Sequence, residues 1–221
     1  MEVTKMFKSL FKGRDYLLNK VLEDIEKMLV EVEDMFSFAL RVLFNHQDET
    51  VDIYKRDQMI NRWQIDIRRR LIEHLVLSPE KDVVASLVFT TLVTDIERIG
   101  DYVKNVIELA HLYPEEIKED ERIKQLKGEG REILILFSRT KEALKKDDEV
   151  KAKEVMGAHV RVAKRCDKFI EELVLEENMS SRRAIFCALV SRYFKRVSAH
   201  LKNAASSVVN PFPRIGYKPE E

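Results

Sequence analysis

Two carboxylates, Glu97 and Asp101, lie four residues apart in a stretch that has the apolar spacing of a long helix. On an α-helix this spacing puts both side chains on one face, one turn apart. Like charges at that spacing repel each other, so a neighbouring cation should offset the repulsion unless the pair lies on a solvated surface. The sequence offers Arg98 and Lys104 as that cation, and a metal ion is the third candidate.

The helix that carries the pair is expected to run from about Pro79 to Leu112. Its apolar stripe consists of Leu92, Ile96, Ile99, Val103, Val106 and Ala110. At 100° per residue, Glu97 and Asp101 fall nearly opposite Ile99, on the side that also carries Thr90, Thr94 and Glu108. We therefore expect the carboxylates on an outer face, where a bound ion would be open to exchange. A purely solvated face would have the same geometry.

The composition favours an all-α protein. The chain has 221 residues, of which 35% are charged and 45% hydrophobic, with only 6 Gly and 5 Pro, a balance typical of long helices with one wet face. This length fits one domain or two small ones. Apolar residues at intervals of three and four, with cap and turn signals such as Asp147-Asp148 and Ser180 between them, predict six helices. Their approximate ranges are 15–45, 51–77, 79–112, 115–146, 148–177 and 180–209.

The run from Asp95 to Asp101, DIERIGD, followed by Asn105, resembles the signature helix of the PhoU family. Members of that family regulate phosphate uptake, repeat a three-helix unit and carry a Glu/Asp-x-x-x-Asp metal motif. The resemblance implies two antiparallel three-helix bundles packed side by side, related by an internal repeat. We assign the first repeat to residues 14–113 and the second, degenerate repeat to residues 114–209.

Comparison of the two repeats shows which of them keeps the motif. The segment from Lys195 to Asn203 aligns with the segment from Glu97 to Asn105 and retains Arg, a small residue, Lys and Asn in register. The alignment puts Lys195 under Glu97 and Ala199 under Asp101, so the second repeat has lost both carboxylates. Lys195 either supplies the positive charge that a metal would give or, as we prefer, lies on a solvated surface.

The family pattern also asks for a second pair of ligands from the preceding helix. The matching positions are Asp57 and Asn61, one turn apart. With Glu97 and Asp101 they imply a metal site in the first repeat only, made of oxygen ligands that suit Fe, Mn or Mg, with Zn or Ni as further candidates. Asn61 stands where the family more often has an acid, which removes one negative charge.

The resemblance implies a non-enzymatic regulator of phosphate uptake and phosphate signalling. Its implied partners are the ATPase of a phosphate ABC transporter and a sensor histidine kinase. Two alternatives stay open: a metal-handling, ferritin-like protein and a PhoU-like module that serves another transporter. The sequence leaves the oligomeric state open, with a homodimer as one option.

Charge and hydropathy exclude several other classes. Basic and acidic residues are equal at 39 each, whereas a non-specific nucleic-acid binder is expected to carry a basic excess. No apolar run approaches the length of a membrane span, so we expect a cytoplasmic protein that is peripheral to the membrane at most. Cys166 and Cys187 form no Cys-x-x-Cys pair and are expected to be reduced and packed in the core.

Other motifs do not point to catalysis. Glu108 and His111 form one Glu-x-x-His, but a di-iron bundle needs two such motifs and two further Glu residues. The other histidines have no metal-ligand spacing and are expected at helix surfaces or core margins: His46, His74, His159 and His200. No organic cofactor, phosphate-binding glycine loop or paired nucleophile and base is indicated.

The two ends of the chain differ from the repeats. Residues 1–14 form a short basic amphipathic pattern, which we interpret as a frayed helical start or a cap on the bundle, with membrane contact as the alternative. Residues 210–221 contain three prolines and are expected to form an extended or disordered tail. Docking of Phe212, Ile215 and Tyr217 on the bundle is the alternative there.

Overall fold

The structure, a computed structural model, describes residues 16–45, 51–77, 82–113 and 117–218. These residues form long α-helices and no strand. The helices are α2 (Tyr16–Asn45), α3 (Ile53–Leu77), α4 (Val83–Leu112), α5 (Glu121–Lys146), α6 (Glu149–Val174) and α7 (Ser181–Val209), followed by the short 3₁₀ helix η2 (Phe212–Arg214). The all-α prediction of two three-helix bundles is confirmed. The predictions for residues 1–14, His46 and Pro79 concern residues outside the described ranges.

Helix starts in the second half are set by side-chain caps. Asp148 accepts a hydrogen bond from Lys151 N at 3.0 Å, and Ser180 accepts one from Arg183 N. Both were predicted as turn or cap positions. The fourth helix begins at Glu121 rather than near residue 115, because Asp120 caps it by accepting from Ile123 N at 2.9 Å. The fifth helix ends at Val174, three residues earlier than expected.

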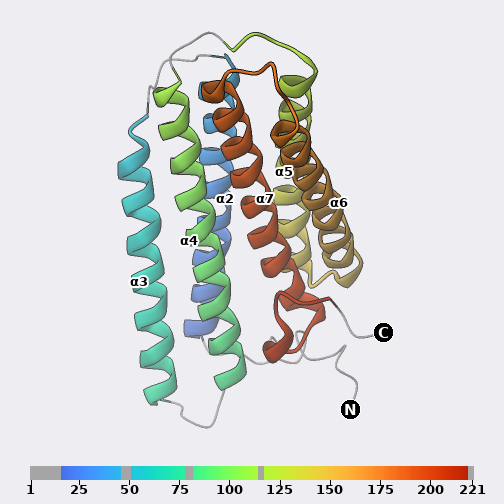
Figure 1. The fold of residues 1–221 in the computed structure, drawn as a ribbon. Helices are drawn as coiled ribbons and strands as arrows, with labels where there is room; N and C mark the ends of the chain where they lie inside the picture. The colour runs from blue at the N-terminus through green and yellow to red at the C-terminus, as the bar shows by residue number, and fades with distance from the viewer. Residues whose placement is uncertain (1–15, 46–50, 78–81, 114–116, 219–221) are drawn as a thin grey trace.

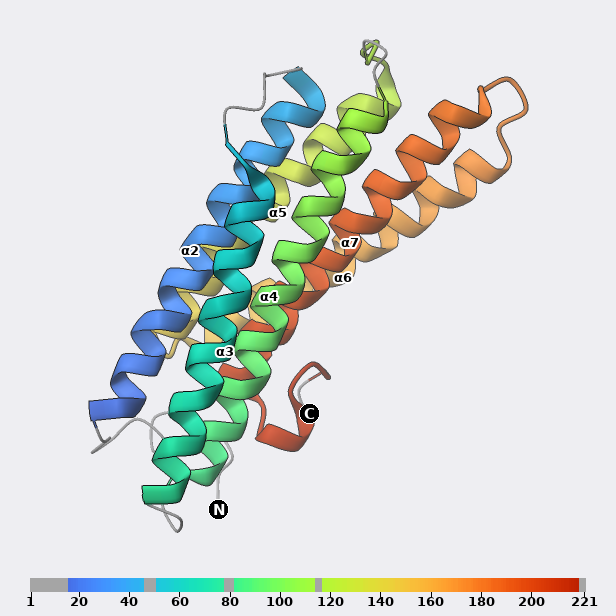
Figure 2. The same ribbon diagram turned by 90° about the vertical axis from the view of Figure 1, so that its left-hand side faces the viewer.

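The two sets of helices share one hydrophobic core. Helices α4 and α7 lie side by side at the centre of the molecule, α3 flanks α4 on one side, and α6 packs against α7 on the other (Figure 1). Behind them α2 packs against α4 and α5, and α5 packs against α7. Figure 2 shows the α6–α7 hairpin leaning away from α2 at its upper end. The apolar stripes of all six helices therefore face a common interior.

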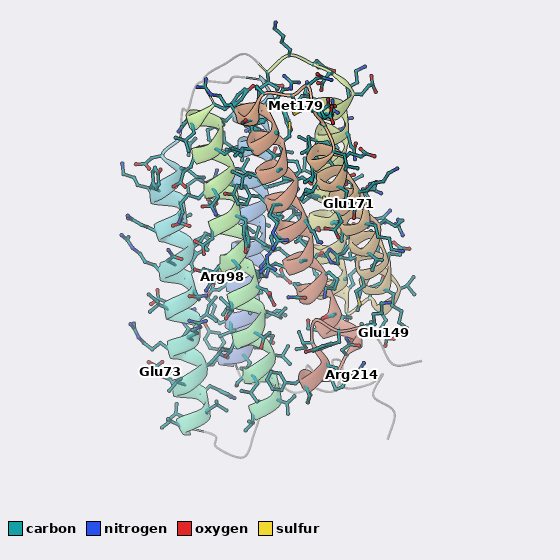
Figure 3. The ribbon with its side chains drawn as sticks, in the orientation of Figure 1. Glu73, Arg98, Glu149, Glu171, Met179 and Arg214 are labelled. Atoms are coloured by element: carbon teal, nitrogen blue, oxygen red, sulfur yellow. The ribbon has the colours of Figure 1, made fainter. Side chains whose placement is uncertain are left out.

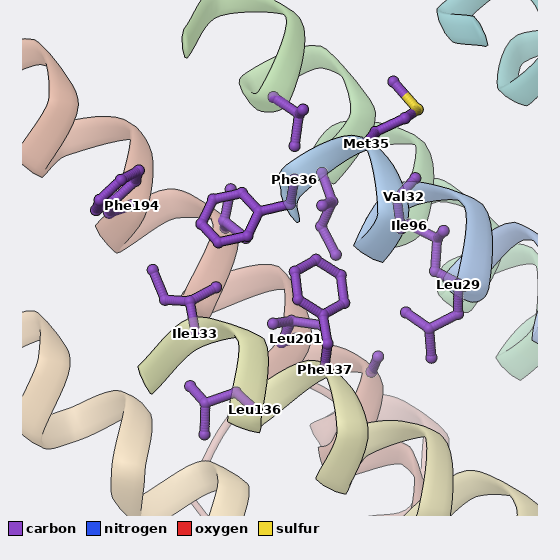
Figure 4. Close-up of a cluster of buried hydrophobic side chains, with 14 of the residues drawn as sticks. Leu29, Val32, Met35, Phe36, Ile96, Ile133, Leu136, Phe137, Phe194 and Leu201 are labelled. Atoms are coloured by element: carbon purple, nitrogen blue, oxygen red, sulfur yellow. The ribbon is translucent and has the colours of Figure 1, made fainter. Parts of the chain in front are cut away.

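Aromatic side chains join the two halves at the centre of this core. Phe36 of α2 packs against Phe137 of α5, with ring centroids 5.7 Å apart, and against Phe194 of α7 at 5.5 Å (Figure 4). Gly130 of α5 lets the two helices approach, since a Cβ there would stand 2.8 Å from Leu40 of α2. Such contacts explain why the halves form one body and not two separate domains.

The tail is the clearest departure from the expected fold. Residues 210–218 fold back on the bundle, so the prediction of an extended or disordered tail is wrong for this part of the chain. The side-chain amide of Asn210 donates to the carbonyl oxygens of Arg214 and Tyr217, at 2.9 and 2.8 Å. Gly216 N donates to Ser206 Oγ at 2.7 Å, and its φ of +88° favours glycine. Two apolar tail side chains pack against the core: Phe212 and Ile215.

Candidate functional site

The face of α4 that carries the two carboxylates is covered by α3. Arg68 of α3 donates to Thr94 Oγ1 at 2.7 Å, and Tyr54 of α3 donates to Glu108 Oε1 at 3.1 Å. The Glu97 side chain is only 15% exposed. The prediction of an outer, open face is therefore wrong for Glu97, whereas Asp101 keeps 32% of its side chain exposed. The helical pattern of α4 alone does not show that a neighbouring helix with its own polar face packs there.

The structure brings the four predicted ligand residues together between α3 and α4. We call Asp57, Asn61, Glu97, Asp101 and Lys104 the first-repeat cluster. Lys104 Nζ donates to Asp57 Oδ2 at 2.9 Å and to Asp101 Oδ1 at 3.3 Å, so it joins the two helices. The amide of Asn61 lies 3.5 Å from Asp57 Oδ2.

Arg98 supplies the second positive charge. Its Nη1 lies 3.1 Å from Asp101 Oδ2 and its Nε lies 3.8 Å from Glu97 Oε2. It sits about midway along α4 (Figure 3). Of the three cations that the sequence left open, the structure therefore places both Lys104 and Arg98 against the carboxylates.

The pKa values reflect this crowding. Burial is the largest influence on Glu97 and raises its pKa, and the negative charge of Asp101 raises it further, while Arg98 acts in the opposite direction. Burial lowers the pKa of Lys104, but its bonds with Asp57 and Asp101 outweigh that effect, so the pKa rises overall. The cluster thus favours a charged Lys104.

In this arrangement the four predicted ligands do not fit a metal ion. The Lys104 ammonium group occupies the position between Asp57 and Asp101 that an ion would need, and the Asn61 contact to Asp57 comes from its amide nitrogen, which is not a metal ligand. Within the described ranges, no three His, Cys, Asp or Glu side chains are grouped so that they could hold a metal ion.

The corresponding region of the second repeat lies between α6 and α7. We call His159, Asp167, Lys195, Ser198 and Lys202 the second-repeat cluster. Lys195 Nζ contacts both carboxylate oxygens of Asp167, at 2.5 and 2.7 Å. His159 Nδ1 lies 3.0 Å from Ser198 Oγ. Lys195 is therefore in an ion pair across two helices, at a position that is partly exposed to solvent.

A polar contact between α4 and α7 links the two repeats, and the sequence analysis missed it. His200 Nδ1 lies 2.7 Å from Asp95 Oδ1, and the Asn203 amide donates to the same oxygen at 3.0 Å. The ring of Tyr102 stacks on His200 with centroids 5.7 Å apart, and Tyr102 also lies 6.1 Å from Tyr193.

These two contacts occur at equivalent positions of the internal repeat. The offset that places Lys195 under Glu97 also places Tyr193 under Asp95 and His200 under Tyr102. The pair Asp95 and His200 is therefore the counterpart of the pair Tyr193 and Tyr102. The repeat offset relates the two contacts to each other, but only the structure shows that either pair is in contact.

The ferritin-like alternative finds no support in the described residues. Glu108, the acid of the single Glu-x-x-His, accepts a hydrogen bond from Tyr54, and His111 is exposed. The two cysteines are buried and unpaired, as expected, and burial raises the pKa of each thiol to about 11. In the part of the chain that the structure describes, no helix is long and apolar enough to cross a membrane.

Comparison with known proteins agrees with the signature helix. Residues 25–110 match the PhoU domain model. The chain is 24% identical over 205 residues to phosphate-specific transport system accessory protein PhoU homolog 1 of Thermotoga maritima, covering 87% of this chain and 85% of that protein. These matches support the PhoU family as the family of this chain. A PhoU homolog of Aquifex aeolicus is 27% identical over 187 residues, covering 81% of this chain and 83% of the homolog.

Solved structures show the same PhoU fold. PhoU from Pseudomonas aeruginosa superimposes with a TM-score of 0.77 at 20% identity, covering 87% of this chain and 95% of that one. The phosphate transport system regulatory protein PhoU from Streptococcus pneumoniae gives the same TM-score at 17% identity, covering 87% and 93%. The matched domain model lies within α2 to α4, the half that carries DIERIGD.

Proposed function

We propose that this PhoU-family protein is a non-enzymatic regulator of phosphate uptake and phosphate signalling. It acts by contact with the ATPase of a phosphate transporter and with its sensor kinase, in the cytoplasm. The observation that carries the proposal is its similarity, over more than four-fifths of both chains, to accessory proteins of phosphate-specific transport systems. The long helical surfaces of the bundle suit such contacts.

One end of the bundle offers an apolar surface for the transporter ATPase. Exposed apolar side chains gather on α3 and on the first turns of α4: Ile65, Ile72, Val76, Leu77, Val83, Val84 and Leu87. Ile65, Ile72 and Val76 recur at helical spacing along one side of α3. This hairpin end lies opposite the end of the molecule that carries Met179 (Figure 3). Apolar surface that no part of the described chain covers is typical of a contact site.

Co-purification tests the proposal. The tagged protein is captured from its own cells at low and high phosphate, and bound proteins are identified. We expect the transporter ATPase or the sensor kinase in the eluate, and less of it with Ile72→Glu/Val76→Glu. Val174→Glu/Leu175→Glu is the matched control, because it places the same charges on equally exposed apolar positions at the other end. If neither partner is captured at either phosphate level, the proposal fails.

Metal binding by Asp57, Asn61, Glu97 and Asp101 stays a prediction. For an ion to bind there, the Lys104 ammonium group must leave the two carboxylates that it contacts. Metal and ammonium are then alternatives for one position. Elemental analysis of the purified protein beside Glu97→Ala/Asp101→Ala tests this, since metal that the parent carries and the variant lacks would place an ion at the cluster.

A further inference from the structure

Three polar side chains form a stripe on the side of α7 that faces α6. Lys195, Ser198 and Lys202 follow one another at intervals of three and four residues, so they share one face of the helix. His159 of α6 meets the middle of the stripe at Ser198 Oγ. Two ammonium groups and a hydroxyl group therefore lie along one side of the second-repeat cluster.

Lys202 has lost the carboxylates that its counterpart contacts. It aligns with Lys104, which bonds Asp57 and Asp101. The second repeat has alanines at both of those positions: Ala199 aligns with Asp101, and Ala163 aligns with Asp57 when Cys166 of α6 is set under Ile60 of α3. Among the described residues, the acceptor for the Lys202 ammonium group is the Gly216 carbonyl oxygen of the tail.

The charge around Lys202 therefore differs from the charge around Lys104. Burial lowers the pKa of Lys202, and the negative charge of Asp95 opposes this only in part. Burial, followed by the charges of Lys202 and Lys195, lowers the pKa of His159 to about 4. Two positive charges thus act on one half-buried ring, and the single carboxylate of the cluster, Asp167, is largely exposed. The region has an excess of positive charge that an anion would neutralise.

The two lysines of the second-repeat cluster keep N–H donors that a ligand could use. Ser198 Oγ donates to the Lys195 carbonyl oxygen at 2.9 Å, so its contact with His159 is one in which the ring Nδ1–H donates. An ammonium group has three N–H donors, and Lys202 uses one of them on Gly216. Lys195 uses two on Asp167, a pair whose exposed position makes it weak. Both lysines can therefore donate to an added oxyanion.

We propose that Lys195 and Lys202, on either side of the buried Ser198, bind inorganic phosphate. A dianion matches the charge of the two ammonium groups, whose long side chains start two helical turns apart on one face of α7. The tail lies over Lys202 through Gly216, which favours a small free anion over a phosphoryl group on a large molecule. The choice of phosphate among oxyanions rests on the proposed function. The evidence for an anion site on Lys195 and Lys202 does not depend on that function.

Calorimetry with inorganic phosphate tests the site on the purified full-length protein at constant ionic strength. The parent is expected to bind with a Kd below about 1 mM. Lys202→Met and Lys195→Met are each expected to weaken binding about tenfold, the effect of losing one charged hydrogen bond. The matched control is Lys168→Met, which removes an exposed α6 lysine paired with Glu172, outside the cluster. Circular dichroism confirms that each variant is folded.

Titrations with two other anions identify the ligand. Weaker binding of sulfate and of glycerol 3-phosphate, a stand-in for a lipid headgroup, supports free phosphate. The proposal is overturned if the parent binds no phosphate, if Lys168→Met weakens binding as much as Lys202→Met, or if either competitor binds as tightly as phosphate. Because no transporter protein is present, failure here is separate from failure of the regulator proposal, which rests on co-purification.

Discussion

The first-repeat and second-repeat clusters occupy equivalent places in the two bundles and carry opposite charge. In the first, Lys104 contacts two carboxylates, Asp57 and Asp101, and Arg98 lies beside Asp101 and Glu97. In the second, Lys195 pairs with the one carboxylate, Asp167, whereas Lys202 contacts a tail carbonyl oxygen, and a neutral histidine lies beside Ser198. Equivalent helices carry the two clusters, so a few side chains account for the inversion.

The equivalent lysines Lys104 and Lys202 have different roles in the two repeats. Lys104 has two carboxylate partners, so it ties α3 to α4 and neutralises charge within the protein. Lys202 faces alanines at the corresponding positions and contacts a tail carbonyl instead. Its charge is therefore available for a ligand, which is the physical basis of the phosphate proposal.

The largest expected contrast is in stability. Lys104→Met leaves the nearly buried Asp57 without its cation and should lower the free energy of unfolding by about 1–3 kcal/mol. Lys202→Met removes a half-buried charge that has no carboxylate partner among the described residues, and should change stability by less than about 0.5 kcal/mol. Urea unfolding at pH 7 of both variants checks this. Equal losses would mean that the two lysines have the same role.

The second contrast concerns His159, whose ordinary pKa is 6.5 and whose pKa here is about 4. Lys202→Met should raise the pKa of His159, yet leave it below 6.5 because burial is the larger cause. Since the unfolded chain takes up this proton at a higher pH than the folded one, His159 should reduce stability as the pH falls from 6.5 toward 4. NMR titration measures the pKa, with Lys168→Met as the control that should not change it.

The smallest expected effect is on Glu97. Asp101→Asn removes the second largest cause of its raised pKa and should lower that pKa, while burial keeps it above the ordinary 4.5. Because the pKa is higher in the folded state, Glu97 favours folding in acid, and this contribution is lost as the pH rises through the folded pKa. NMR titration checks the direction. Asp66→Asn, at an exposed pair with Arg69, should leave the pKa of Glu97 unchanged.

The sequence predicted the helices well because apolar spacing and caps are local signals. Ser180 and Asp148 act as caps, and the run that includes Glu97 and Asp101 led directly to the family. The errors came from contacts between distant segments. The pattern of α4 alone could not show that α3 covers the carboxylates, nor that Lys104 would pair with Asp57, which lies 47 residues earlier.

The tail was mispredicted for a similar reason. Its prolines indicate an extended chain, but its position depends on the Asn210 amide, which holds two carbonyl oxygens of the following turn. Composition does not reveal a single side chain that satisfies several backbone groups. The contact of Asp95 with His200 was missed because it joins residues 105 positions apart, and the repeat alignment does not show which positions touch.

The central claim is that Lys104 fills the cation position of the first-repeat cluster, in competition with metal. The most direct test compares Mn²⁺ binding by the parent, by Lys104→Met and by Lys104→Met combined with Glu97→Ala/Asp101→Ala, all checked for equal helicity. We predict that Lys104→Met binds Mn²⁺ about tenfold more tightly than the parent and that the combined variant loses this gain. Equal binding by the parent and Lys104→Met, or binding by neither, would contradict the claim.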